Sequence, residues 1–156
     1  MKKEDFVIYL GSDHAGFYLK DKIISYFKKK NIEFKDFGPF KYNENDDYPD
    51  FIIPLAKKVS ENKSTLGIIL GGSGQGEAIA ANKIKGIKAI VLYSFNKNII
   101  KLSKEHNNAN ILSLGSRFLS EKQAINSIKL WLKTKFSNEK RHIRRLKKIE
   151  NFENGK

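Results

Sequence analysis

The chain has 156 residues, 40% of them hydrophobic and 30% charged, which predicts one soluble globular domain built around a single core. It contains no cysteine, and this excludes disulfides, thiolate metal sites and cysteine nucleophiles. The formal net charge of +13 attracts small anions and is compatible with nucleic-acid binding, but the lysines are scattered along the chain, which favours a merely solvated basic surface.

The beginning of the chain carries no recognisable targeting segment. It is charged and runs directly into a strand-like stretch, so no signal peptide can be read there. The apolar runs are far too short to span a bilayer. We therefore expect a cytoplasmic protein that does not contact a membrane.

Strand-like and helix-like patterns alternate through the first half of the chain. Short apolar runs predict strands at residues 6–10, 32–37 and 66–70. Apolar residues at helical spacing predict one helix at residues 15–30 and another from Pro49 to about Asn62, with a proline at its favoured start. Pro54 lies inside this second helix, and we expect it to shorten or kink the helix.

The alternation continues through the second half. Strands are predicted at residues 87–92 and 109–114, and helices at residues 77–84, 96–105, 121–136 and 139–150. Strands that alternate with helices form a parallel sheet covered on both faces. The sequence therefore predicts an α/β fold, an open, doubly wound, Rossmann-like sheet of five parallel strands. We expect residues 1–150, including the basic last helix, to form a single domain, and residues 151–156 to be a frayed tail.

Polar residues follow three of the predicted strands. Asp13 and His14 follow the first strand, a glycine-rich turn follows the third, and Arg117 follows the fifth. In open α/β sheets, ligands bind beyond the carboxyl ends of the strands, at the point where the strand order reverses. We therefore expect these residues to contribute to one binding site.

The glycine-rich turn reads GGSGQGE over residues 71–77, with four glycines in seven residues. Glycine lets the backbone approach an anion closely, and the start of the next helix offers unpaired N–H groups and a positive dipole end. A simple strand-to-helix turn needs fewer glycines, so an anion cradle is favoured. The turn lacks the Walker pattern and follows the third strand rather than the first, which disfavours a nucleotide cofactor.

Glu77 stands where this turn becomes a helix. It is either an acid that stabilises the first helical turn, or the base that removes a proton beside a carbonyl while backbone donors hold the developing enediolate. The helix end would keep Glu77 ionised and lower its basicity. Burial or a bound substrate would therefore have to raise its pKa.

Histidine and arginine are both scarce in this chain. His14 follows a strand, whereas His106 lies at a helix end, where it could simply complement the helix dipole. Three of the four arginines crowd around His142, and they are Arg141, Arg144 and Arg145. Because a planar guanidinium grips phosphate with two hydrogen bonds, this placement favours phosphate binding over a basic helix end that faces RNA or solvent.

Together these motifs resemble the ribose-5-phosphate isomerase B family, which includes the galactose-6-phosphate and allose-6-phosphate isomerases. The matching segments are GSDHAG at 11–16, the Tyr48-Pro49-Asp50 element, GGSGQGEAIAANK at 71–83, KEHNNAN at 104–110, GSR at 115–117 and RHIRR at 141–145. They cover nearly the whole chain. Any one of them is weak, but six in the same order make the resemblance specific.

The resemblance implies an aldose–ketose isomerase of the pentose phosphate pathway that interconverts ribose 5-phosphate and ribulose 5-phosphate through an enediolate, without metal or organic cofactor. The implied catalytic residues are Glu77 as the base, His106 as the acid that opens the sugar ring, and Asp13. The implied substrate-binding residues are Asp13, His14, Tyr48, Gly72, Ser73, Gly74, Gln75, Gly76, Asn107, Arg117, Arg141, His142 and Arg145. In this assignment the glycine turn holds the enediolate, and Arg117, Arg141 and Arg145 grip the phosphate.

One position departs from many members of that family, which carry a cysteine base where this chain has Gly71. A second branch uses a glutamate at the position of Glu77, and the chain resembles that branch. The resemblance also implies a homodimer or homotetramer whose active sites combine two subunits. A six-carbon substrate (allose or galactose 6-phosphate) remains an alternative. A non-catalytic nucleic-acid-binding protein is a more distant one, and it leaves the glycine turn unexplained.

Overall fold

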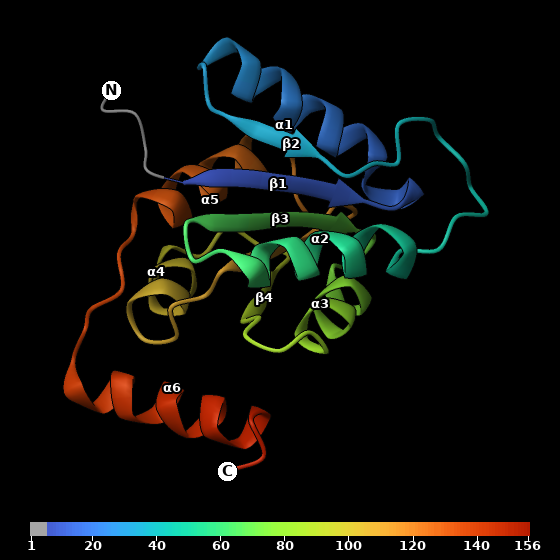
Figure 1. The fold of residues 1–156 in the computed structure, drawn as a ribbon. Coiled ribbons are helices and arrows are strands. Elements are labelled where there is room, and N and C mark those ends of the chain that lie inside the picture. The colour runs from blue at the N-terminus through green and yellow to red at the C-terminus, as the bar shows by residue number, and fades with distance from the viewer. Residues whose placement is uncertain (1–5) are drawn as a thin grey trace.

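The computed structural model describes residues 6–156 and shows one twisted sheet between two layers of helices (Figure 1). The strands are β1 (Val7–Ser12), β2 (Phe34–Asp36), β3 (Thr65–Gly71), β4 (Ala89–Leu92) and β5 (Ile111–Gly115). The helices are α1 (Phe17–Lys29), α2 (Pro49–Glu61), α3 (Gln75–Asn82), α4 (Lys97–Glu105), α5 (Glu121–Lys133) and α6 (Lys140–Glu153), with a 3-10 turn η1 at His14–Gly16. The predicted α/β class is confirmed.

The sheet has five strands in the order β2-β1-β3-β5-β4, and all neighbouring pairs are parallel. The order reverses between β1 and β3, so the switch point lies where these two central strands end. This is the doubly wound topology that the alternation predicts. It places the residues after β1 and those after β3 at one edge of the sheet, called here the carboxyl edge.

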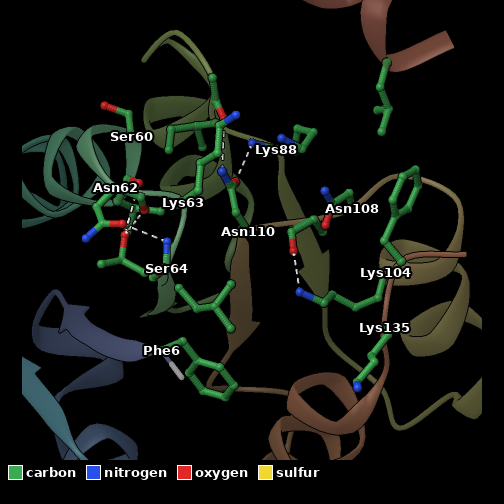
Figure 2. Close-up of a pocket in the computed structure, with 18 of the residues that line it drawn as sticks. Phe6, Ser60, Asn62, Lys63, Ser64, Lys88, Lys104, Asn108, Asn110 and Lys135 are labelled. Atoms are coloured by element: carbon green, nitrogen blue, oxygen red, sulfur yellow. Dashed lines mark hydrogen bonds between the residues drawn. The ribbon is translucent and has the colours of Figure 1, made fainter. Parts of the chain in front are cut away.

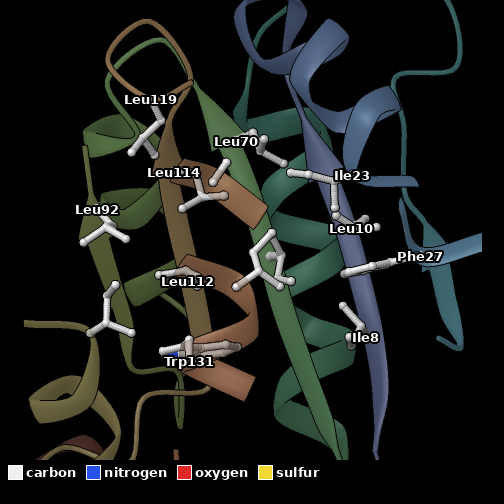
Figure 3. Packing of buried hydrophobic residues seen from close by; sticks show 14 of the residues in the cluster. Ile8, Leu10, Ile23, Phe27, Leu70, Leu92, Leu112, Leu114, Leu119 and Trp131 are labelled. Atoms are coloured by element: carbon white, nitrogen blue, oxygen red, sulfur yellow. The ribbon is translucent and has the colours of Figure 1, made fainter. Parts of the chain in front are cut away.

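The core consists of two apolar layers, one on each face of the sheet. Successive side chains of a strand point to opposite faces. Ile68 and Leu70 therefore pack in the layer with α1, α4 and α5, whereas Ile69 packs in the layer with α2 and α3. The first layer is shown in Figure 3 and contains the fully buried side chains of Phe27 and Trp131. Burial of each such side chain stabilises the fold by roughly 1.5–3 kcal/mol.

The expectation that Pro54 shortens its helix is wrong. Helix α2 continues through Pro54 for 13 residues, from Pro49 to Glu61. The amide that proline lacks would have bonded to Asp50 in the first turn, and the exposed ring lies on the solvent side. The opposite face of α2 is buried against the sheet, and this packing outweighs the lost hydrogen bond.

Helix α6 stands away from the sheet and is joined to α5 through residues 134–139 (Figure 1). Near its start, the ring of His142 packs against His106 with 4.1 Å between centroids. At its other end, the Gly86 amide donates to Oε2 of Glu153 at 3.1 Å. The helix runs to Glu153, three residues beyond its predicted end at residue 150, and the frayed tail stays a prediction. Within the described part of the chain, no helix has the length and apolar character that crossing a bilayer requires.

Candidate active site

The loops that follow β1, β3 and β5 are tied to one another by backbone hydrogen bonds. The amide of Asp13 donates to Leu70 at 3.3 Å, and the amides of Ser116 and Arg117 donate to Gly71 and Gly72 at 2.8 and 3.0 Å. The three loops therefore form one hydrogen-bonded platform at the carboxyl edge. The prediction that the residues after these strands lie together is confirmed for the loops that carry Asp13, the glycine turn and Arg117. That they form one binding site stays a prediction.

The glycine turn is anchored from below. Gly74 has φ +78°, a left-handed conformation, and a Cβ atom there would lie 3.1 Å from the hydroxyl of Ser113. That hydroxyl donates to the Gly74 carbonyl at 2.6 Å, which fixes the turn on β5. Within residues 6–156, the amides of Ser73, Gly74 and Gly76 have no hydrogen-bond acceptor, so the turn presents backbone donors.

Tyr48 covers this turn from the start of α2. A Cβ atom on Gly76 would lie 2.8 Å from Cζ of the Tyr48 ring, so the absence of a side chain at position 76 lets the ring pack directly on the turn. Tyr48 precedes Pro49, which begins α2. The predicted substrate-binding residue Tyr48 is therefore brought to the glycine turn, although Gly76 lies 28 positions further along the chain.

Glu77 lies in the first turn of α3 and is 4% exposed. Its carboxyl group lies against Gly71, in the space that a Cβ atom on Gly71 would occupy. Burial raises the pKa of Glu77, a hydrogen bond from its own backbone lowers it, and the charge of Asp13 raises it further. Burial thus supplies the increase in basicity that the helix N-terminus alone would not give, as a general base requires.

Asp13 and His14 follow β1 at the carboxyl edge, and the charge of Asp13 acts on Glu77. Asp13 is 7% exposed and accepts a hydrogen bond from the Gly16 amide at 3.1 Å, which caps η1. His14 pairs with Asp46, whose Oδ1 lies 2.7 Å from its Nδ1. This hydrogen bond is the largest cause that raises the pKa of His14, and the positive charge of Arg117 opposes it. Arg117 lies directly over Gly72, since a Cβ atom on Gly72 would meet the guanidinium at 3.0 Å.

A second group of predicted site residues lies elsewhere. It consists of His106, Asn107, Arg141, His142 and Arg145, at the end of α4 and the start of α6. His142 is 2% exposed, and its Nδ1 lies 2.8 Å from the Ser137 hydroxyl. Desolvation lowers the pKa of His142, and the charge of His106 lowers it further. The rest of this group is half-buried or exposed.

The two groups lie at opposite edges of the sheet. Glu77 follows the carboxyl end of β3, whereas His106 precedes the amino end of β5. The register pairs Gly67 with Ile111 and Gly71 with Gly115, so the length of β5, roughly 16 Å, separates the two edges. Figure 1 shows the same separation, with α3 at one end of the sheet and the end of α4 at the other. One chain therefore does not bring its predicted base and its predicted ring-opening acid together.

The edge of the sheet where the strands begin is called here the amino edge. A cavity of about 1160 Å³ lies there, between α6 and the sheet. Figure 2 shows its lining, which includes Phe6, Lys88, Lys104 and Asn110. It contains neither Glu77 nor any residue of the glycine turn. The size of this cavity reflects how far α6 stands from the sheet, and the candidate active site is assigned by its chemistry at the carboxyl edge instead.

Asp13, His14 and Asp46 offer ligand atoms that lie within 4.8 Å of one another, a spacing compatible with a metal ion. Nδ1 of His14 is already bonded to Asp46, so a metal there would have to break this ion pair. We therefore assign these atoms to the protein's own hydrogen bonding. The expectation of an enzyme without metal or organic cofactor stays a prediction.

Asp46 and Ser113 belong to this site and are absent from the residues predicted by sequence. Asp46 lies in a polar loop whose composition indicates only a turn, and Ser113 lies inside a strand. Their roles depend on contacts with residues 32 and 39 positions away. No local pattern signals such contacts.

Comparisons with known proteins agree with this geometry. A family model described as Ribose/Galactose Isomerase matches residues 8–149. Ribose-5-phosphate isomerase B of Mycolicibacterium paratuberculosis is 39% identical over 146 residues, which are 94% of this chain and 91% of that protein. The crystal structure of ribose-5-phosphate isomerase B from Mycoplasma genitalium with bound ribulose 5-phosphate has a TM-score of 0.91 at 39% identity, and covers 97% of this chain and 98% of that one. The enzyme of Clostridium thermocellum has a TM-score of 0.89 at 41% identity, over 96% and 99% of the two chains.

Proposed function

This chain belongs to the Ribose/Galactose Isomerase family, and from this premise we propose that it interconverts ribose 5-phosphate and ribulose 5-phosphate. The reaction moves one proton between C1 and C2 of the open-chain sugar and changes no oxidation state of the substrate as a whole. It therefore needs a base, a means to stabilise an enediolate and a grip on the phosphate.

The observation that carries this proposal is the position of Glu77. Its buried carboxylate lies on the same turn as the amides of Ser73, Gly74 and Gly76, which have no acceptor among residues 6–156. A base and a set of donors in one place are what proton abstraction beside a carbonyl requires. In this mechanism Glu77 takes the proton from C2 of the aldose and returns it to C1, while the amides hold the negative oxygen of the enediolate.

The ring-opening and phosphate-binding groups complete the site from a second copy of the chain. His106 and the arginines of α6 lie at the amino edge of their own sheet, too far from Glu77 to act on the same sugar. They are close to one another, through the contact of the His106 and His142 rings. A homodimer in which each amino-edge group meets the partner's glycine turn would unite the acid, the base and the phosphate grip. Sites shared between subunits are also what the family resemblance implies.

We propose ribose 5-phosphate as the substrate, and not a six-carbon sugar phosphate, because the relatives named above are ribose-5-phosphate isomerases. The Mycoplasma genitalium structure also holds ribulose 5-phosphate. The glycine turn, Glu77 and Arg117 would serve either substrate, since they act on C1, C2 and phosphate. The cytoplasmic location likewise stays a prediction from the sequence.

The test is an isomerisation assay with purified full-length protein, in the presence of EDTA. We expect turnover of ribose 5-phosphate, with a specificity constant well above those for allose 6-phosphate and galactose 6-phosphate. Faster turnover of either six-carbon sugar would overturn the substrate, and no turnover of any of the three would overturn the activity. Activity that disappears with EDTA and returns with a divalent metal would contradict the expectation of a metal-free reaction.

A further inference from the structure

The loop between β2 and α2 places the side chain of Asp46 against His14 in the candidate active site. Asp46 lies on this loop, and its Oδ1 is 2.9 Å from the backbone nitrogen of His14 and 2.7 Å from Nδ1 of the His14 ring. The Asp46 side chain is 7% exposed, whereas that of His14 is 28% exposed. Asp46 therefore holds both the backbone and the ring of His14 from the protein side and leaves the ring accessible.

Among residues 6–156, the Asp46 side chain forms hydrogen bonds only with His14. Within the described residues, its second oxygen, Oδ2, is buried and has no hydrogen-bond partner. A buried carboxylate oxygen without a partner costs free energy, so this side chain is poorly placed for stability alone. Its position is better explained by what it does to His14.

The geometry also fixes which nitrogen of His14 is free. A carboxylate accepts hydrogen bonds and cannot donate them, so Nδ1 of His14 must carry a proton and donate it to Asp46. Nε2 is then the ring nitrogen left for a ligand. The charged groups that act on the His14 ring are Asp13, Asp46 and Arg117, and the ring of Tyr42 lies edge-on to it at 6.5 Å between centroids.

Resting on the proposed function, we propose that Asp46 is a positioning residue, which holds the His14 ring turned so that Nε2 donates to the phosphate group of the substrate beside Arg117. The phosphate is the ligand favoured at Nε2 because the loops that carry His14 and Arg117 are both bonded to the end of β3, through Asp13 to Leu70 at 3.3 Å and through Arg117 to Gly72 at 3.0 Å. A guanidinium that donates two hydrogen bonds and a charged imidazole that donates a third would bind a phosphate strongly. The largest cause that raises the pKa of His14 is its hydrogen bond to Asp46, so removal of that carboxylate would leave less of the charged form at neutral pH.

The experiment compares Asp46→Asn with Asp47→Asn in the full-length protein. Both changes remove one negative charge from the same loop, but the Asp47 side chain is exposed and makes no hydrogen bond or ion pair within the described residues. The KM and kcat for ribose 5-phosphate and the dissociation constant of inorganic phosphate are measured between about pH 6 and pH 8.5, the range in which histidine titrates. Histidine ring nitrogen shifts are followed by NMR in the same samples.

For Asp46→Asn we expect KM and the phosphate dissociation constant to rise on the order of 10-fold near the upper end of that range, because a charge-assisted bond is lost. Near pH 6 the rise should be smaller, since His14 is charged there even without Asp46. The change in kcat should stay within about threefold, and the NMR titration of His14 should move to lower pH. Asp47→Asn should behave as the wild type in every measurement.

Loss of kcat at unchanged phosphate affinity, an equal effect at all pH values, or an equal effect of Asp47→Asn would each overturn the proposal. If the asparagine variant fails to fold, the wild-type titration decides instead. A His14 ring that titrates at or below the ordinary pKa of histidine, or that is protonated on Nε2 alone when neutral, contradicts the role of Asp46. Failure of the proposed function is distinguishable, because a wild type without isomerase activity still gives the phosphate and NMR measurements.

Discussion

Gly71 and Glu77 occupy one shared volume, since a Cβ atom on Gly71 would overlap the Glu77 carboxyl group. Position 71 is where many members of the resembling family carry a cysteine base. The structure gives a physical reason why this chain uses glycine there. A side chain at position 71 and a buried glutamate at position 77 compete for the same space, so the two kinds of base exclude each other in this turn.

Gly71→Ala should therefore lower both stability and activity. We expect a loss of about 1–3 kcal/mol in the free energy of unfolding, the usual cost of overpacking a filled site. In the Glu77→Ala background the same change should cost much less, because the overlapping carboxyl group is gone. Urea unfolding of the two single variants and the double variant forms the thermodynamic cycle that measures this coupling. Additive effects within about 0.5 kcal/mol would show that the two positions do not compete.

Glu77→Gln should abolish turnover and leave ligand affinity largely intact. The amide keeps the shape of the side chain but cannot accept the C–H proton, and a general base typically contributes about 10²–10⁴-fold to the rate. The measurement is kcat for ribose 5-phosphate together with the dissociation constant of inorganic phosphate. Glu121→Gln, an exposed glutamate at the start of α5, is the matched control. A Glu77→Gln enzyme that keeps more than about a tenth of the wild-type rate would refute this role.

The fall of kcat/KM on the acid side of its pH profile should report the pKa of Glu77. Burial raises its pKa above the ordinary carboxylate value, so the ionised base is lost as the pH falls through that raised pKa. We expect kcat/KM to fall by about tenfold per pH unit below an apparent pKa higher than 4.5. A profile that stays flat to below pH 4.5 would show that the acting base is not a buried carboxylate.

Mixed dimers should show whether the site is shared. Glu77→Gln and His106→Ala would each be nearly inactive alone if His106 acts in ring opening. When the two variants exchange subunits, about half of the dimers are mixed. If sites are shared, a mixed dimer has both defects in one site and none in the other, so the activity of the mixture should return to about a quarter of wild type. Mixing Glu77→Gln with Glu77→Ala is the control. No recovery in mixtures proven by mass spectrometry to contain mixed dimers would contradict the shared site.

Lys104 should make stability depend on pH in the alkaline range. Burial, followed by the charge of Lys88, lowers the pKa of Lys104 from 10.5 to about 8, while its ammonium donates to the Ala109 carbonyl at 3.1 Å. Between these two values the unfolded chain holds a proton that the folded chain has released, so stability rises with pH. Relative to Lys104→Met, the wild type should gain on the order of 1–3 kcal/mol from pH 8 to pH 10.5.

The control for this measurement is Lys148→Met, because Lys148 is exposed on α6. Its pH dependence of unfolding, measured with urea at each pH, should match that of the wild type. If Lys104→Met also follows the wild type over this range, the ammonium of Lys104 is not desolvated in the folded protein.

The sequence by itself determined the order of strands and helices, the parallel sheet and the edge at which Asp13, the glycine turn and Arg117 meet. These features depend on local patterns, such as the spacing of apolar residues, and on the rule that parallel strands end at one edge. The unbroken helix through Pro54 escaped such patterns, because it depends on packing against the sheet. The extension of α6 to Glu153, whose side chain accepts from the Gly86 amide, escaped them as well.

Only the tertiary structure decided which of the predicted site residues share a place. His106 and Glu77 belong to the same set of motifs, yet the chain folds them to opposite edges of the sheet. The pairing of Asp46 with His14 and the shared volume of Gly71 and Glu77 likewise became visible only in three dimensions. The reason is physical: a motif records which side chains are present, whereas their distances are set by the packing of elements far apart in the chain.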